Sequence, residues 1–163
     1  MKKYQLLIGL LFLFTACDST TEDEVDTADS TKVDSARVSM TDSHYFWTSD
    51  FDPEKGMIMV RSFPISTDSL NATDMISKLN SLYPEVPLEL LRKSNDSIYL
   101  KISNSTFLTQ QMGSSGAEAY LAEVTFNLTE VEGISYVDIR FREGDHAVPK
   151  TYTRTDFINE PVK

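Results

Sequence analysis

The sequence predicts one α+β domain, built on a small, mostly antiparallel sheet that carries two helices on one face. Several short segments alternate apolar and polar residues with the period of a half-buried strand, and two longer segments repeat apolar residues at helical spacing. These segments follow in the order β-α-β-β-α-β. A right-handed crossover in each βαβ half would bring both helices to the same face of the sheet.

The first strand and the first helix are predicted between residues 45 and 84. Aromatic residues at 45–47 mark the expected start of the domain, and a turn at 53–56 precedes a predicted strand over residues 57–63. The segment 71–74 (NATD) is typical of a helix start, and Pro84 should end the helix. The apolar residues at helical spacing between them are Met75, Ile76, Leu79, Leu82 and Tyr83.

A β-hairpin is predicted after the first helix. The polar segment 94–96 (SND) tolerates the backbone angles of a turn. On either side of it, apolar residues alternate along the chain, so that each strand has one apolar face. These residues are Val86, Leu88 and Leu90 before the turn, and Ile98, Leu100 and Ile102 after it.

The second helix has the strongest sequence signal. Residues 113–116 (GSSG) lead into it, Ser115 and Glu118 have the spacing of a capping box, and Gly133 should end it. Glu130 and Glu132 would then lie at the negative end of the helix dipole, an unfavourable place for a carboxylate. The apolar stripe of this helix consists of Ala117, Leu121, Val124, Leu128 and Val131.

One more strand, and a short tail strand, are predicted after the second helix. Val137, Ile139 and Phe141 alternate with polar or charged residues, which indicates a half-buried strand. The segment 144–145 (GD) closes this strand. A short strand around Tyr152 would complete the domain.

Residues 1–16 have the features of a secretory signal peptide. Lys2 and Lys3 precede an apolar run, and small residues precede Cys17. The run is shorter than the roughly 20 residues of a transmembrane helix. The tetrad 14–17 (FTAC) resembles the lipobox of bacterial lipoproteins, although Leu is commoner than Phe at its first position. The resemblance implies lipidation of Cys17 by a diacylglycerol thioether and an acyl chain such as palmitate, and therefore a membrane anchor in the cell envelope.

Residues 17–44 are expected to form a disordered acidic tether in front of the domain at 45–163. The tether is rich in Ser, Thr and Asp and has few large apolar side chains, so it cannot bury enough surface to offset its ordering entropy. A plain spacer is one interpretation. The cluster 22–24 (EDE) resembles a surface-export signal, whereas Asp18 resembles an inner-membrane retention signal. Triplets such as 29–31 (DST) resemble O-glycosylation sites.

The second half of the domain resembles the C-terminal half of the GerMN domain, which is found in spore-germination and sporulation lipoproteins. The resemblance rests on residues 96–102 (DSIYLKI) and on residues 113–145, which run from a Gly/Ser-rich segment through an apolar helix and a glycine to a strand that ends in glycine. It implies a small α+β module used in protein–protein or envelope interactions, with no catalytic residues. The matching positions are Ser114, Glu118, Thr125, Thr129, Gly133, Val137 and Gly144.

The sequence offers little for catalysis, cofactors or metals. The single cysteine is the predicted lipid site, and only two histidines are present, so neither a disulfide nor a metal site rich in soft ligands is expected. No nucleophile with a base is apparent. Ser114 and Ser115 lie where a helix N-terminus could hold an anion, which supports the alternative of a small-ligand binding or sensing domain.

The sheet face opposite the helices is the main candidate for a partner-binding surface. Alternation places Tyr99, Lys101, Tyr136 and Arg140 on this face, and Arg61 is a further candidate. A mixed aromatic and basic surface on an acidic protein is typical of a binding face. Nucleic acid is not expected as a partner, because the chain has 25 acidic against 15 basic residues and carries an export signal. An envelope protein or a cell-wall component is expected instead.

Overall fold

The computed structural model of the 163-residue chain describes residues 44–157. The predicted signal peptide, the lipidation of Cys17 and residues 17–43 of the predicted tether lie outside this part. The predicted end of the tether at residue 44 is wrong, because His44 already belongs to a strand. Among the described residues, no helix is both long enough and apolar enough to cross a membrane.

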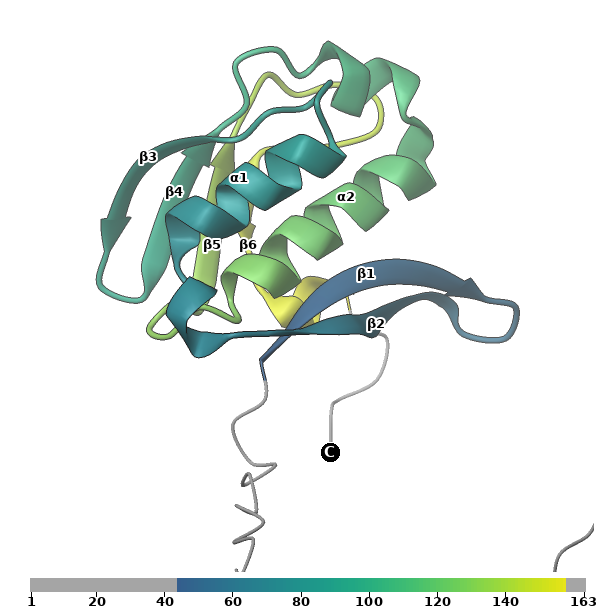
Figure 1. Cartoon of the computed structure of the whole chain (residues 1–163). Coiled ribbons are helices and arrows are strands. Elements are labelled where there is room, and N and C mark those ends of the chain that lie inside the picture. The colour runs from purple at the N-terminus through teal and green to yellow at the C-terminus, as the bar shows by residue number, and fades with distance from the viewer. Residues whose placement is uncertain (1–43, 158–163) are drawn as a thin grey trace, which may run out of the picture. The chain divides into compact units, whose positions relative to one another are not determined.

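The described part contains two separate sheets (Figure 1). The larger sheet has the strand order β3-β4-β5-β6, with bounds Glu89–Ser94, Ser97–Lys101, Tyr136–Arg140 and Lys150–Tyr152. Its central pair, β4 and β5, is parallel, and the two outer pairs are antiparallel. The smaller sheet is an antiparallel hairpin of β1 (His44–Asp52) and β2 (Gly56–Ile65).

Two helices lie on one face of the larger sheet (Figure 1). They are α1 (Ala72–Leu82) and α2 (Gly113–Leu128). The core between them and the sheet includes Leu79, Ile98, Leu100 and Val137, all with no exposed surface. The prediction of a small α+β fold is therefore confirmed, and β6 corresponds to the tail strand predicted around Tyr152.

Helix α1 forms where the sequence predicted it. The side chain of Asn71 accepts a hydrogen bond from the Asp74 backbone N–H at 2.9 Å, so it satisfies one of the donors that the first turn leaves unpaired. The helix ends at Leu82, two residues before Pro84. It buries Met75, Ile76 and Leu79, three of the five apolar residues at helical spacing.

Helix α2 differs from the prediction at both ends. It begins at Gly113, directly after one turn of π-helix (η3, Phe107–Gln111), and Met112 occupies the N-cap position without a side-chain hydrogen bond. The predicted capping box is therefore wrong: Ser115 is already inside the helix. The helix ends at Leu128, and Gly133 adopts a positive φ of 74° in the turns that follow.

The strand predicted over residues 57–63 forms, but its predicted place in the main sheet is wrong. It is part of β2, whose partner is β1 and not a strand of the larger sheet. A bulge between Phe46 and Trp47 interrupts the alternation of β1. Phe46 is 1% exposed, and the neighbouring Trp47 packs against the core as well, so β1 has no single apolar face that its sequence could reveal.

The predicted strand 86–90 is displaced by a few residues. Val86 and Leu88 are buried, but they precede β3, and Leu90 is 44% exposed. Two side chains hold the segment before the strand. Asn80 bonds both the N–H and the C=O of Leu88, and the Tyr120 hydroxyl donates to the Val86 carbonyl at 2.7 Å. A bulge between Leu90 and Arg92 then shifts the register of β3.

Candidate partner-binding face

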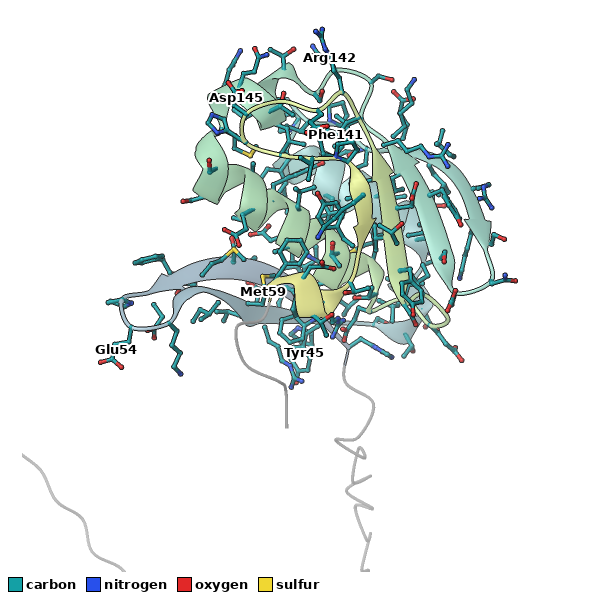
Figure 2. All side chains as sticks on the ribbon, turned by 180° about the vertical axis from the view of Figure 1, so that it is seen from behind. Tyr45, Glu54, Met59, Phe141, Arg142 and Asp145 are labelled. Atoms are coloured by element: carbon teal, nitrogen blue, oxygen red, sulfur yellow. The ribbon has the colours of Figure 1, made fainter. Side chains whose placement is uncertain are left out.

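The four residues predicted to share a face lie on the outer side of the larger sheet. In the parallel register of β4 and β5, Lys101 is opposite Arg140. The alternating neighbours Ile98, Leu100, Val137 and Ile139 are fully buried on the helix side. Tyr99, Lys101, Tyr136 and Arg140 therefore point away from the helices. Figure 2 views the molecule from behind and shows the larger sheet from this side. We refer to this surface as the outer face.

Cations and an aromatic ring line up across three strands of the outer face. The Arg92 guanidinium of β3 lies 3.5 Å from the centroid of the Tyr99 ring, and the Arg140 guanidinium of β5 lies 5.9 Å from it. Both distances are within the range of a cation–π interaction. The Tyr99 ring thus orients two arginines whose charged ends remain at the surface, because both arginines are exposed.

Asp138, a carboxylate of the outer face, already accepts hydrogen bonds from other residues of the chain. Asp138 is opposite Tyr99 in the register, and one of its oxygens accepts from Arg140 Nε at 3.1 Å. Its other oxygen accepts from the Thr151 hydroxyl of β6 at 3.0 Å. Arg140 is 63% exposed at its side chain despite this ion pair, so much of its guanidinium is open to a partner.

The charge of the outer face is opposite to that of the chain. Arg92, Lys101 and Arg140 supply three positive charges there, against Glu89 and Asp138. The whole chain has a formal net charge of −10. Tyr136, which is 43% exposed, adds an aromatic surface at one end of β5. The face can therefore attract an anionic group and offer it planar hydrogen-bond donors.

The sequence did not predict Glu89, Arg92 and Asp138 as members of this face, and it misplaced Arg61. The bulge in β3 brings Arg92 opposite Tyr99, which simple alternation could not show. Asp138 was recognised only as one of the polar or charged residues that alternate with the apolar residues of this strand. Arg61 is not on this face: it lies on β2, and its guanidinium is 5.0 Å from the Tyr45 ring and 5.3 Å from the Trp47 ring. The suggestion that Arg61 joins the sheet face is wrong.

Ser114 and Ser115, the predicted anion-holding residues, lie in the first turn of α2. Gly113 before them has a positive φ of 75°. The Ser114 hydroxyl is 3.1 Å from Nδ1 of His146, which comes from the loop between β5 and β6. Both serines lie near the surface. An anion site here stays a prediction.

A buried polar cluster connects α2 to the hairpin. Trp47 donates its backbone N–H to Asn127 Oδ1 and accepts from Asn127 Nδ2, both at 2.8 Å. Ser49 donates its backbone N–H to Glu123 Oε1 at 2.8 Å, and Tyr45 donates its N–H to Glu130 Oε1 at 3.2 Å. Two side chains of α2, and Glu130 just after the helix, therefore occupy the edge of β1 that faces away from β2.

The position of Glu130 after the last turn of α2 now has an explanation. Arg154 donates to Glu130 Oε2 at 2.6 Å, and the Trp47 indole donates to the same oxygen at 3.0 Å. Burial alone would raise the pKa of Glu130, but the bonds from Arg154, Trp47 and the Tyr45 backbone together hold it below its ordinary value. These donors stabilise the carboxylate at a place where the helix dipole disfavours it.

Within residues 44–157, no three His, Cys, Asp or Glu side chains lie together in a way that could hold a metal ion. A small pocket of about 250 Å³ opens beside the end of β2. Its lining includes Phe63, Ile65, Met75 and Lys78. The Lys78 ammonium lies 4.0 Å from the centroid of the Phe63 ring, so it partly covers this apolar surface.

Comparisons with known proteins gave no match. No protein-family model matches the chain, and no curated protein or solved structure is similar enough to match it. The resemblance to the GerMN domain therefore stays a prediction.

Proposed function

We propose that this chain is an envelope lipoprotein whose α+β domain is a non-catalytic binding module, and that it recognises an anionic envelope protein or cell-wall component through the outer face. The anchor in this proposal rests on the lipobox-like tetrad ending at Cys17. The binding role rests on the outer face itself.

The observation that carries the proposal is the cationic, aromatic surface on a strongly acidic chain. Arg92 and Arg140 are both held by the Tyr99 ring, and Lys101 lies directly opposite Arg140. Preorganised cations lose less side-chain entropy when a partner binds. The acidic remainder of the chain disfavours other contacts with anions, so an anionic partner would be directed to this face.

The test is capture of envelope partners by the full chain after solubilisation in detergent. We expect Lys101→Glu and Arg140→Glu each to reduce the amount of co-purifying partner roughly tenfold, equivalent to ~1.4 kcal/mol, and the double variant to reduce it further. Added salt should weaken capture by the wild-type chain, because ions screen exposed charges.

The matched control is Lys93→Glu. Lys93 lies on β3 next to Arg92, but it is opposite the buried Ile98 and so does not belong to the outer face. It carries the same charge change, and its ammonium makes only a 3.4 Å contact with the Glu132 carbonyl. If K93E reduces capture as much as R140E does, or if the double variant retains full capture, the outer face is not the binding surface.

A further inference from the structure

The hairpin has one protected edge and one open edge. The outer edge of β1 is occupied by Glu123 and Asn127 of α2 and by Glu130, which follows the helix. Strand β2 has β1 as its only strand neighbour within residues 44–157. No backbone hydrogen bond from this part of the chain reaches the opposite edge of β2. Figure 1 shows β1 between α2 and β2. The end of β2, at Phe63 and Ile65, lies beside Met75 and Lys78 of α1.

The pairing with β1 determines which groups of β2 point outward. Trp47 and Ser49 send their backbone N–H groups to α2, so they do not exchange hydrogen bonds with the residues opposite them. Those residues are Arg61 and Met59, and the alternation of an antiparallel ladder gives Met57 the same orientation. Three residues of β2 therefore present both an N–H and a C=O at the open edge.

This open edge is long and has little of the protection that exposed edges normally carry. β2 has ten residues, and apolar side chains beside its edge are exposed, among them Val60 at 38% and Phe63 at 39%. Edge strands are usually shielded by charge or proline. Here the one charged side chain, Arg61, lies against two aromatic rings of β1, and Pro64 lies beyond the three outward-facing residues.

We propose that the open edge of β2 pairs with β2 of a second copy of this chain, which would give a continuous four-stranded antiparallel sheet in the order β1-β2-β2-β1. In this arrangement Met59 lies on the two-fold axis, opposite Met59 of the second copy. Met57 then lies opposite Arg61 of the second copy, and Ile58 opposite its Val60. The pairing rests on the hairpin alone and is independent of the outer face.

The second copy is the occupant favoured by the pattern of β2 itself. All three outward-facing residues of each strand find partners in this one register, as an isologous contact requires. Two Ile–Val pairs of β-branched side chains form across the contact, each with Ile58 from one copy and Val60 from the other, and such pairs stabilise adjacent strands. Arg61 faces a methionine, so no like charges are opposed. Pro64 lies outside the paired segment, and its missing N–H removes nothing from the ladder.

Paired charge changes at residues 58 and 60 test the register. We expect Val60→Lys or Ile58→Glu alone to weaken dimerisation of the detergent-solubilised full chain at least about tenfold in sedimentation velocity, because each places a charge opposite an apolar side chain. The double variant V60K/I58E should recover most of the dimer, since the introduced lysine of each copy would then meet the introduced glutamate of the other. Circular dichroism should show unchanged folding in all three variants.

Disulfide cross-linking in membranes gives an independent readout. The wild-type chain has one cysteine, Cys17, and serves as background. Met59→Cys should give a covalent dimer under mild oxidation, because directly opposite residues in a hydrogen-bonded pair are about 5.5 Å apart at Cα, within disulfide range. Val148→Cys is the control, since Val148 is 47% exposed and lies outside the hairpin.

Three outcomes would overturn the proposal. The first is a wild-type chain that sediments as a monomer at every concentration tested. The second is a cross-link of M59C to a different protein in place of a second copy. The third is a V60K/I58E variant that is no better a dimer than either single variant. Because none of these measurements involves the outer face, their failure would leave the proposed binding function standing.

Discussion

Gly144 shows how a single residue can determine the position of a whole loop. A Cβ on Gly144 would lie 2.7 Å from Thr109 Cβ and 3.2 Å from the Thr109 carbonyl oxygen. Thr109 cannot move aside easily, because it is 3% exposed, its hydroxyl donates to the Ser105 carbonyl at 2.9 Å, and its carbonyl accepts from the His146 N–H. The loop after β5 therefore packs on η3 only if residue 144 has no side chain.

We expect Gly144→Ala to lower the free energy of unfolding by about 1–3 kcal/mol, as other overpacking substitutions do. Gly116→Ala is the matched control. There the added Cβ would lie 2.7 Å from Cγ of the flexible Met112 side chain, and alanine favours the helix, so the variant should be neutral or slightly more stable. Urea unfolding followed by circular dichroism measures both. Equal stability of the two variants would mean that the Thr109 contact is not constraining.

At the scale of single elements, α2 was predicted as an amphipathic helix but is buried on nearly all sides. All five residues of its predicted apolar stripe are buried, but the last of them, Val131, lies after the end of the helix. Glu123 and Asn127 lie outside that stripe, yet they are 4% and 0% exposed. Periodicity cannot show that polar side chains are matched to the backbone of a strand that is distant in the sequence. The spacing of acceptors at 123, 127 and 130 was the available signal.

The candidate site was likewise predictable only where the strands alternate regularly. Tyr99, Lys101, Tyr136 and Arg140 could be placed on one face because β4 and β5 alternate regularly. Arg92 could not, because the bulge that aligns it with Tyr99 depends on how β3 pairs. The hairpin was missed as a unit for a related reason. The side chains of β1 contact the core on both of its faces, which removes the alternation that identifies a strand.

The docking of the hairpin depends on Asn127, and its replacement by aspartate tests this. Asn127→Asp keeps the shape but removes the donor that bonds the Trp47 and Glu123 carbonyls, and it adds a charge between Glu123 and Glu130. We expect a loss of about 2–3 kcal/mol in the free energy of unfolding, because buried groups are left unpaired. The single tryptophan, Trp47, reports this event directly by fluorescence during urea unfolding.

Asn95→Asp is the control for this substitution. Asn95 is exposed, has a positive φ of 54° in the turn between β3 and β4, and aspartate tolerates that conformation. Its stability should change by no more than a few tenths of a kcal/mol. An Asn127→Asp variant as stable as Asn95→Asp would show that the amide of residue 127 does not hold the hairpin.

For the whole molecule, α2 connects the hairpin on one side with α1 and the larger sheet on the other. The ion pair of Glu130 and Arg154 lies at this junction and also reaches Trp47, whose indole shares Glu130 Oε2 with Arg154. Arg154 belongs to η4 (Arg154–Phe157), the last described turn of the chain. Loss of this pair should therefore weaken both ends of the described chain together.

The pH dependence of stability follows from two carboxylates, Glu130 after the end of α2 and Asp156 in η4. Glu130 and Asp156 both have pKa values below their ordinary 4.5 and 3.8. In each case burial raises the pKa, but hydrogen bonds lower it by more. Glu130 accepts these bonds from Arg154 and Trp47, and Asp156 accepts them from Lys150 and Thr153. A carboxylate whose pKa is lower in the folded state contributes stability above its unfolded pKa and loses it as pH falls through the folded pKa.

We therefore expect the free energy of unfolding to be steady near neutral pH and to fall progressively below about pH 5, since the unfolded chain takes up protons first. Glu130→Gln should lower stability at pH 7 by about 1–3 kcal/mol, because its amide cannot accept all three donors. The same variant should lose less of its free energy of unfolding than the wild-type chain as the pH falls. Adding Asp156→Asn to it should reduce this loss further. Urea unfolding at a series of pH values measures both effects. An acid slope as steep in Glu130→Gln as in the wild-type chain would show that Glu130 does not govern it.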